Sequence, residues 1–416
     1  MNNDIGINVV GIFKAETGFG EAVRGTLNAL IAAGIPVTII DMEVSLKNRL
    51  NDESVTGFSE ENTYPVNLVQ VNPFMIAKLL ENKGAGFFKG KYNIAYWVWE
   101  TTEIPDNFLE FEYLFDEIWT ASEYCLKAIS QKATIPVVCI PHIAEINADD
   151  IAPSLPFTLA KEKFIFLNIF DFGSLIERKN TLGLIEAFKK AFEKSNNDVL
   201  LVIKSSTGFN YPKEKKLVEN AIASYPNIML TDAMFRRNEL LALSQRADCY
   251  VSLHRSEGFG LNMSDAMVMG KPVIATGYSG NMEFMSINNS FPVKYRLETI
   301  DYKLPPYPQG SIWSNPDTDH AASLMQYVVA NPEEAAAIGK RAKEDMEKSF
   351  SSKAIGILIQ KRVDVIRKQL SESNGTEVLK NDLNVANSQI SLLNKRVKYL
   401  ENTFYNKIRK KINGKK

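Results

Sequence analysis

The residues best suited to chemistry lie in one short segment, residues 256–265, which reads SEGFGLNMSD. An apolar run at residues 249–253 precedes it, so Glu257 is expected in a loop at the carboxyl end of a buried strand. Gly258 and Gly260 let backbone N–H groups approach a ligand closely. The helix predicted to follow points its amino end at the same place, and a helix N-terminus suits a phosphate. The segment therefore predicts a site for a phosphorylated ligand.

A second carboxylate, Asp265, is expected in the first turn of that helix, which we predict to begin near Asn262. Asp265 and Glu257 can then face one pocket, where carboxylates accept hydrogen bonds from sugar or ribose hydroxyls. The alternative is a loop followed by a charged first turn that binds no ligand.

The longer string at residues 256–274 resembles the E-x7-E motif of the retaining family-4 glycosyltransferases, which have the GT-B fold. Residues 247–255 and 277–281 are similar to the same family, and the similarity covers about residues 5–365. In that family the first Glu of the motif contacts the donor sugar and the second contacts the nucleotide ribose. The resemblance assigns these roles to Glu257 and Asp265, although Asp265 is one methylene shorter than the usual Glu.

The resemblance also implies a set of residues around the donor. The expected donor-binding residues in and beside the motif are His254, Gly258, Phe259, Gly260 and Leu261. Met234 lies where the family's loop lines the base.

Two further segments match phosphate-binding parts of the family. Residues 176–180 read IERKN and resemble its basic cluster, so Arg178 and Lys179 are expected to neutralise charge on the leaving diphosphate. A solvated helix start is the alternative for this segment. Gly18 and Gly20, in ETGFGE, resemble the N-terminal Gly-rich loop that reaches the diphosphate, with a tight turn into a helix as the alternative.

Glu100 ends the run YWVWE at residues 96–100. Many relatives have a functional His near this strand end, and Glu100 takes its place here as a candidate catalytic residue beside Glu257. Trp97 and Trp99 are expected in the core.

The chain is not expected to bind a metal ion. Its three His residues are scattered, and Asp317 and Asp319 form a D-x-D that we predict to cap a helix. No cofactor is expected, because the nucleotide-diphosphate sugar is a substrate.

Short β-rich runs alternate with helical stretches along most of the chain, which predicts an α/β fold with parallel sheets. The predicted GT-B architecture has two Rossmann-like, doubly wound domains that face a cleft. We place an acceptor-side domain at 1–155, a nucleotide-sugar-binding domain at 160–330, closing helices at 331–371 and a tail at 372–416.

The tail carries a heptad stripe at 379–404, which predicts a coiled coil and self-association. Residues 405–416 are basic and free of acids, and could bind an anionic membrane surface.

Composition excludes several classes of protein. The 416 residues are 45% hydrophobic and 23% charged, which is ordinary for a globular chain. Lys and Arg (48) balance Asp and Glu (49), so no nucleic-acid partner is expected. Three Cys indicate a reducing compartment, and no signal peptide or membrane-spanning run is evident. We expect a cytoplasmic protein, with peripheral attachment to the inner face of the plasma membrane as a further option.

The function that these observations favour is a retaining, metal-independent glycosyltransferase of surface polysaccharide or lipopolysaccharide synthesis. Its partners would be a nucleotide-sugar donor and a glycan or lipid-linked acceptor. Two alternatives stay open at this point: a nucleotide-sugar epimerase of the same fold, and an inactive scaffold that acts through the coiled coil.

Overall fold

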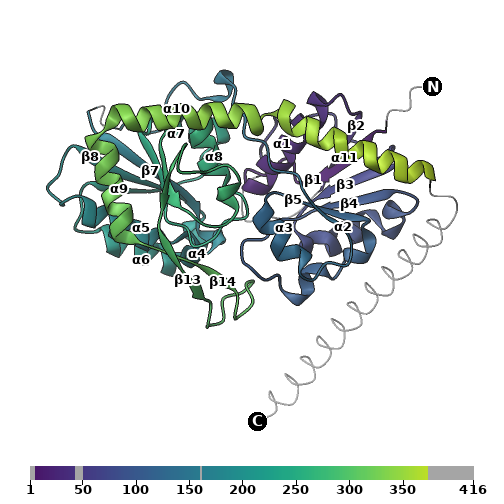
Figure 1. Ribbon diagram of the computed structural model, residues 1–416, viewed down its shortest axis with the longest axis horizontal. Helices are drawn as coiled ribbons and strands as arrows, with labels where there is room; N and C mark the ends of the chain where they lie inside the picture. Colours follow the sequence, from purple (N-terminus) through teal and green to yellow (C-terminus); the bar gives the residue numbers. More distant parts are fainter. Residues whose placement is uncertain (1–4, 43–49, 160–161, 373–416) are drawn as a thin grey trace, which may run out of the picture.

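The computed structural model describes residues 5–42, 50–159 and 162–372. These residues form two units, each with a six-stranded parallel sheet covered by helices on both faces (Figure 1). Each sheet separates two apolar layers, as a doubly wound sheet must when both of its faces are buried. The predicted coiled coil and basic tail lie outside the described residues.

The first unit has the strand order β2-β1-β3-β4-β5-β6. Its strands are β1 (Ile7–Gly11), β2 (Val37–Asp41), β3 (Val66–Gln70), β4 (Tyr92–Tyr96), β5 (Glu117–Thr120) and β6 (Val137–Cys139). Its helices are α1 (Gly18–Ala32), α2 (Ile76–Lys83) and α3 (Glu123–Ser130).

Helix α1 buries Val23, Leu27 and Leu30 against the sheet, as its periodicity predicts. The next apolar residue, Ile31, lies off this face and is 58% exposed. Residues one position apart on a helix point about 100° apart, so Leu30 and Ile31 cannot both face the core centre.

The second unit has the order β12-β11-β10-β7-β8-β9. Its strands are β7 (Phe164–Asp171), β8 (Val199–Ser206), β9 (Ile228–Asp232), β10 (Cys249–Ser252), β11 (Val273–Thr276) and β12 (Phe291–Val293). Its helices are α4 (Ile176–Lys179), α5 (Thr181–Ala191), α6 (Pro212–Ile222), α7 (Arg237–Arg246), α8 (Leu261–Val268), α9 (Thr318–Ala330) and α10 (Pro332–Ser349).

Helix α11 (Ser352–Glu372) returns to the first unit and packs along α1 (Figure 1). The close approach requires a glycine, because a Cβ on Gly356 would lie 2.7 Å from the carbonyl oxygen of Ala29. The pair Arg362–Glu117 adds an ion pair between α11 and β5.

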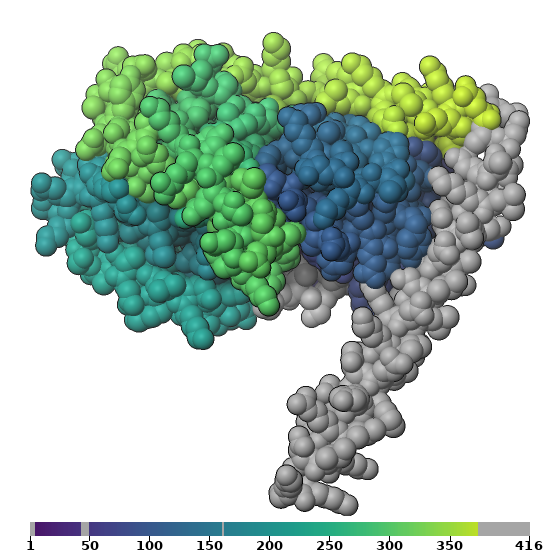
Figure 2. Space-filling view, turned by 60° about the horizontal axis from the view of Figure 1, so that its bottom comes forward, coloured from purple at the N-terminus to yellow at the C-terminus, as the bar shows by residue number. Residues whose placement is uncertain are grey.

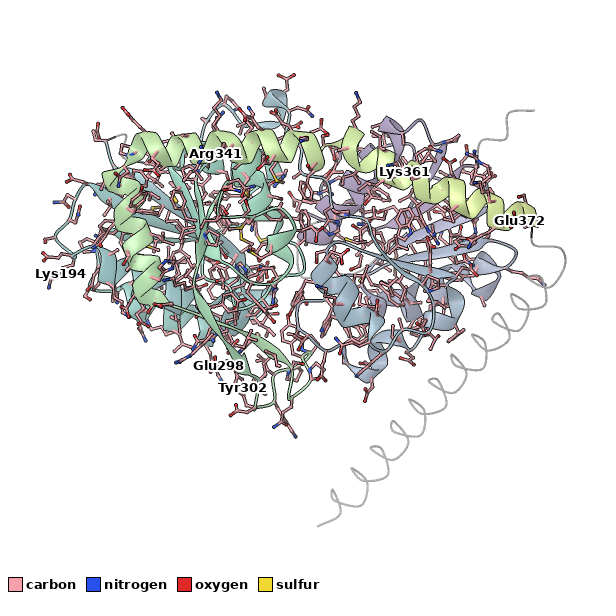
Figure 3. The ribbon with its side chains drawn as sticks, in the orientation of Figure 1. Lys194, Glu298, Tyr302, Arg341, Lys361 and Glu372 are labelled. Carbon is pink, nitrogen blue, oxygen red and sulfur yellow. The ribbon has the colours of Figure 1, made fainter. Side chains whose placement is uncertain are left out.

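A hairpin that the sequence did not predict joins the units at another point. It consists of the antiparallel strands β13 (Tyr295–Thr299) and β14 (Ile312–Pro316) with their connecting loop, and is called the arm here. Glu298 and Tyr302 lie on its outer part (Figure 3), while Tyr307 is buried in the core of the first unit, 5.3 Å from the ring of Trp99. The space-filling view shows the arm lying against the first unit (Figure 2).

Candidate active site

The loop between β10 and α8 holds Glu257 at the carboxyl end of a strand, as the sequence predicts. Gly260 precedes the first residue of α8 and has a φ of +105°, a backbone conformation that residues other than glycine rarely adopt. Ser279, which follows β11, also holds the loop in place, because its Oγ accepts a hydrogen bond of 2.8 Å from the backbone N–H of Glu257.

Glu257 lies between two basic side chains from α4. Arg178 Nη1 is 3.0 Å from Glu257 Oε2, and Lys179 Nζ contacts Glu257 Oε1. The Glu257 side chain is only 10% exposed and that of Arg178 only 5%. One buried cation, Arg178, and one half-buried cation, Lys179, thus lie next to a buried anion, and removing either kind of charge would leave the other without its partner.

The charges of this cluster determine its protonation. Burial raises the pKa of Glu257, but the positive charges of Lys179 and Arg178 outweigh it and hold this pKa at about 2. Burial lowers the pKa of Arg178, yet nearby acidic groups that include Glu257 and Glu100 raise it overall. Glu257 is therefore a carboxylate and Arg178 a cation at neutral pH.

Local geometry explains why α4 presents these residues to the loop. Asn180 ends α4 with a φ of +51°, a left-handed conformation that Asn adopts more readily than most residues. Its side-chain Nδ2 donates a 2.8 Å hydrogen bond to the carbonyl of Leu253, and Arg178 Nη1 donates to the carbonyl of Ser256 at 2.9 Å. Helix α4, which is a single turn, is therefore joined by hydrogen bonds to both ends of the Glu257 loop.

Glu100 comes from the first unit and joins the same cluster. Its Oε1 is 3.7 Å from Arg178 Nη2, and its Oε2 accepts a 3.4 Å hydrogen bond from the hydroxyl of Tyr307 on the arm. The two residues proposed as catalytic, Glu100 and Glu257, thus share Arg178. Trp97 and Trp99 are buried, which confirms that they belong to the core.

Asp265 lies near the boundary between the two units and pairs with Arg237, a residue that the sequence did not single out. Arg237, the first residue of α7, reaches it with Nη1–Oδ2 and Nη2–Oδ1 distances of 2.5 and 2.8 Å. Arg237 Nε is also 3.4 Å from Glu21 of α1, so it links the two units. The prediction that Asp265 lies in the first turn of its helix is wrong, because α8 begins at Leu261, one residue earlier than predicted, and the first turn therefore ends before Asp265.

Gly18 and Gly20, predicted in a Gly-rich loop, lie in the first turn of α1, and this turn faces the start of α8. A Cβ on Gly18 would lie 3.6 Å from Leu261 Cδ1, so these two predicted donor-binding residues are neighbours across the boundary. Gly20 has a structural reason to be glycine, because its Cβ would lie 2.0 Å from the carbonyl oxygen of Ala15.

Two other residues of the motif pack against the first unit. A Cβ on Gly258 would lie 2.2 Å from Val98 Cγ1, and Ser122 Oγ donates a 2.7 Å hydrogen bond to the Gly258 carbonyl. Phe259 is buried, with its ring 5.2 Å from that of His142. Both residues anchor the loop, a role that sequence reasoning did not assign to them.

The remaining predicted residues lie around this region. His254 is fully buried, and its Nε2 lies 3.0 Å from Asn281 Oδ1. Burial lowers the pKa of His254, which favours the neutral ring. Met234 is half-buried between β9 and α7.

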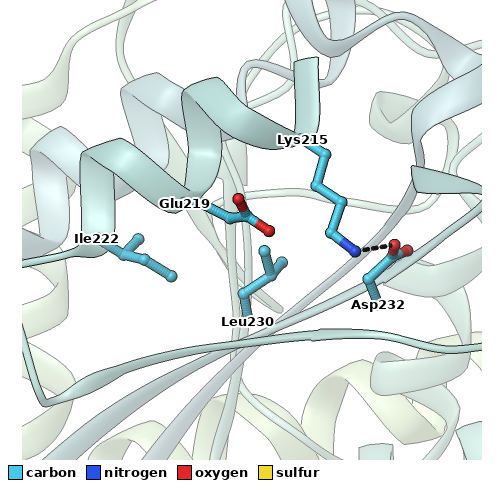
Figure 4. Close-up of a pocket in the computed structure, with 5 residues that line it drawn as sticks. All are labelled: Lys215, Glu219, Ile222, Leu230 and Asp232. Atoms are coloured by element: carbon cyan, nitrogen blue, oxygen red, sulfur yellow. Dashed lines mark hydrogen bonds and ion pairs between the residues drawn. The ribbon is translucent and has the colours of Figure 1, made fainter. Parts of the chain in front are cut away.

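A polar hollow of about 310 Å³ lies elsewhere in the second unit, between α6 and β9 (Figure 4). Lys215 and Asp232 close one side of it with an ion pair of 2.8 Å. The carboxylate of Asp232 also accepts hydrogen bonds from Ser205 and Gly208, so its oxygens are already engaged.

The described residues contain neither a cluster of metal-binding side chains nor a membrane-spanning helix. No three His, Cys, Asp or Glu side chains in ranges 5–42, 50–159 and 162–372 gather as a metal site would require. Asp317 instead caps α9 by accepting hydrogen bonds from the backbone N–H groups of Asp319 and His320, which confirms that prediction. Within the same ranges, no helix has the length and apolarity needed to cross a membrane.

Comparison with known proteins finds a family resemblance in the second unit. Residues 158–345 match the family model of the glycosyl transferases group 1. No curated protein matches the sequence.

Solved structures agree on the fold over nearly the whole chain. Sucrose-phosphate synthase from Thermosynechococcus elongatus is 15% identical, with a TM-score of 0.61 over 89% of this chain and 100% of that one. The HepE protein of Anabaena, solved with UDP and glucose, is 13% identical, with a TM-score of 0.58 over 87% of this chain and 100% of its own. A Rickettsia africae glycosyltransferase is 17% identical, with a TM-score of 0.58, 89% coverage of this chain and 100% of that one. These similarities and the two Rossmann-like units confirm the predicted GT-B fold.

Proposed function

We propose that the protein transfers a sugar from a nucleotide-diphosphate sugar to a hydroxyl group of a glycan or lipid-linked acceptor. The second unit binds the donor and the first unit binds the acceptor. One observation carries the proposal: Glu257 lies between Arg178 and Lys179, in the loop that leads into the N-terminus of α8. A carboxylate for sugar hydroxyls thus lies beside cations suited to a diphosphate.

In the proposed reaction, the bond between the sugar C1 and the diphosphate oxygen breaks. A bond from C1 to the acceptor oxygen forms on the same face, so the anomeric configuration is retained. The acceptor proton passes to the departing phosphate oxygen. Arg178 and Lys179 stabilise the negative charge that develops on the leaving group, which makes the reaction independent of a divalent metal.

The donor residues follow from the same arrangement. Glu257 binds hydroxyls of the donor sugar, and Gly18 and Gly20 approach the diphosphate from the first unit. Glu100 holds Arg178 in place from the acceptor side. Asp265 becomes available to the ribose when Arg237 moves away from it.

The nucleotide that should be tested first is uridine diphosphate. The Anabaena HepE protein was solved in complex with UDP and glucose, and with UDP-glucose. The proposed setting is surface polysaccharide or lipopolysaccharide synthesis at the cytoplasmic face of a membrane. Residues 379–404 would mediate self-association, and residues 405–416 would contact anionic lipid.

A panel of nucleotide-sugars tests the function directly. A ligand at 100 times its Kd adds about 2.7 kcal/mol of stability, so thermal shifts identify the donor. Turnover of that donor is then measured with and without acceptor sugars, and with and without EDTA. Transfer that survives EDTA supports the proposal, and complete loss that Mg²⁺ or Mn²⁺ restores contradicts the metal-independent mechanism. Conversion of the donor to its C2 epimer would identify an epimerase instead, and no turnover of any donor would favour a scaffold.

A further inference from the structure

Strand β3 carries two buried amide side chains, one near each end. Asn67, near the amino end, donates to Asn93 Oδ1 at 2.8 Å and accepts from Asn8 Nδ2 at 3.0 Å. Gln70, the last residue of the strand, is only 5% exposed. Neither its Nε2 nor its Oε1 has a hydrogen-bond partner within the described ranges. The protein thus satisfies one buried amide of β3 and leaves the other unsatisfied.

The unsatisfied amide is the one at the functional edge of the sheet. Gln70 is in register with Gly11 of β1, just before that strand leads into the Gly-rich loop. On its other side, β4 ends at Tyr96 and the chain continues from there to Glu100. The loops that follow β4 and β5 at this edge contact the second unit. Ser256 donates a hydrogen bond to the carbonyl of Glu100 in the first of these loops, and Ser122 in the second donates one to the carbonyl of Gly258.

Strand alternation determines which way the Gln70 side chain points. Val66 and Leu68 belong to the core layer that includes Leu27 of α1, and Gln70 shares their face because side chains two residues apart point the same way. The amide therefore lies on the α1 side of the sheet, at the end where α1 begins with Gly18.

A buried amide without partners is unfavourable, because it has given up its hydrogen bonds to water and gained none. An apolar side chain of similar shape would avoid that loss. Unsatisfied buried polar groups occur at functional sites, where the group lowers the stability of the fold but takes part in binding or catalysis.

We infer that Gln70 binds a hydroxyl group of a sugar held between the two units, with Nε2 as donor and Oε1 as acceptor. This inference rests on the proposed glycosyltransferase function. The sugar is either the transferred residue of the donor or the acceptor, since both must meet at this edge. The shared chemistry is a sugar hydroxyl, which can pair with both halves of an amide.

Gln70→Met tests the inference, because Met keeps the length of the side chain and removes both polar atoms. We expect the variant to melt at a higher temperature than the wild type and to lose about tenfold in kcat/KM for transfer, which corresponds to about 1.4 kcal/mol. Asn67→Leu is the matched control: it removes the partnered amide of the same strand and should lower the melting temperature.

Two kinetic measurements identify the sugar. If hydrolysis of the donor without acceptor falls in Gln70→Met, the amide binds the donor sugar. If hydrolysis is unchanged while KM for the acceptor rises, it binds the acceptor. Unchanged hydrolysis and unchanged transfer in folded Gln70→Met would overturn the inference, as they would in Gln70→Asn if the first variant does not fold.

Failure of the proposed function would look different. Wild-type protein that turns over no nucleotide-sugar refutes that function whatever Gln70 does. Gln70 is then assessed by the thermal shift that the nucleotide-sugar panel produces. A smaller shift in Gln70→Met than in the wild type supports the contact with a sugar, and equal shifts overturn it.

Discussion

Arg237 and Asp265 form a bidentate ion pair, with N–O distances of 2.5 and 2.8 Å. Asp265 is the residue for which the family resemblance implied a contact with the nucleotide ribose. The Arg237 side chain also reaches Glu21 in the first unit. The carboxylate expected to bind the nucleotide is therefore occupied by a residue that links the two units. Donor binding at Asp265 requires Arg237 to give up one partner.

Replacing Arg237 should destabilise the fold through Asp265. Arg237→Met leaves the buried carboxylate without its cation, which costs roughly 3 kcal/mol for a pair of this kind. Urea unfolding measures the loss. In a double-mutant cycle, Asp265→Asn added to Arg237→Met should recover part of it, because the uncompensated charge is gone. Additive losses would show that the two side chains do not interact.

Glu257→Gln should abolish transfer while the fold survives. The substitution keeps the shape of the side chain and removes the charge, so a contact that is strongest in the transition state is lost. We expect kcat to fall by about 10²-fold or more, as for the loss of one transition-state hydrogen bond. Circular dichroism checks the fold, and Glu219→Gln on α6 is the control. A kcat near the wild-type value would remove Glu257 from the active site.

Lys179→Ala should weaken the binding of the free nucleoside diphosphate. A charge-assisted contact to phosphate contributes roughly 1.5–3 kcal/mol, which corresponds to a loss of about one to two orders of magnitude in affinity. Titration calorimetry measures it. Lys190, which pairs with Glu186 and Asp319 away from the Glu257 cluster, provides the control variant Lys190→Ala. Equal affinities for all three proteins would show that Lys179 does not bind the diphosphate.

His142 should make the protein less stable in weak acid. Burial lowers the pKa of His142 to about 3 from 6.5, so the unfolded chain takes up a proton before the folded protein does. Stability is therefore present above pH 6.5 and falls as the pH drops through the window below it, by up to about 1.4 kcal/mol per pH unit.

The variant His142→Gln isolates this effect. Between pH 6.5 and 4.5 its free energy of unfolding should fall less steeply than that of the wild type. The loss that comes from Glu257, whose carboxyl has an ordinary pKa of 4.5, is common to both proteins and cancels in the comparison. Measurements at pH 7.5, where His142 is neutral in both states, correct for lost packing. Parallel curves for the two proteins would contradict a buried neutral His142.

Truncation after Ser373 should leave donor binding intact and reduce oligomerisation, vesicle association, or both. The heptad stripe at 379–404 needs a partner to be stable as a helix, and the basic residues at 405–416 each add about 1 kcal/mol near an anionic leaflet. Sedimentation and binding to phosphatidylserine-containing vesicles compare the full and shortened chains. Identical behaviour in both assays would defeat the prediction.

The sequence by itself determined the elements and the place of the motif. Alternating apolar runs predicted the parallel sheets, because periodicity is a local property that a strand or helix expresses wherever it lies. The same local signals placed Glu257 in the loop after β10 and Asp317 at the start of α9. They could not place the arm, whose strand β13 is exposed throughout and shows no buried pattern.

Only the tertiary structure decided which charges and packing surfaces meet. The partners Arg178 and Glu257 are 79 residues apart, and Glu21 and Arg237 are 216 apart, so no local window contains both members of either pair. Gly258 fits the motif as a ligand-binding glycine, yet its missing Cβ is also required by Val98 in the other unit. The isolation of the Gln70 amide is likewise invisible in sequence, since whether a buried polar group finds a partner depends on how every neighbouring element packs.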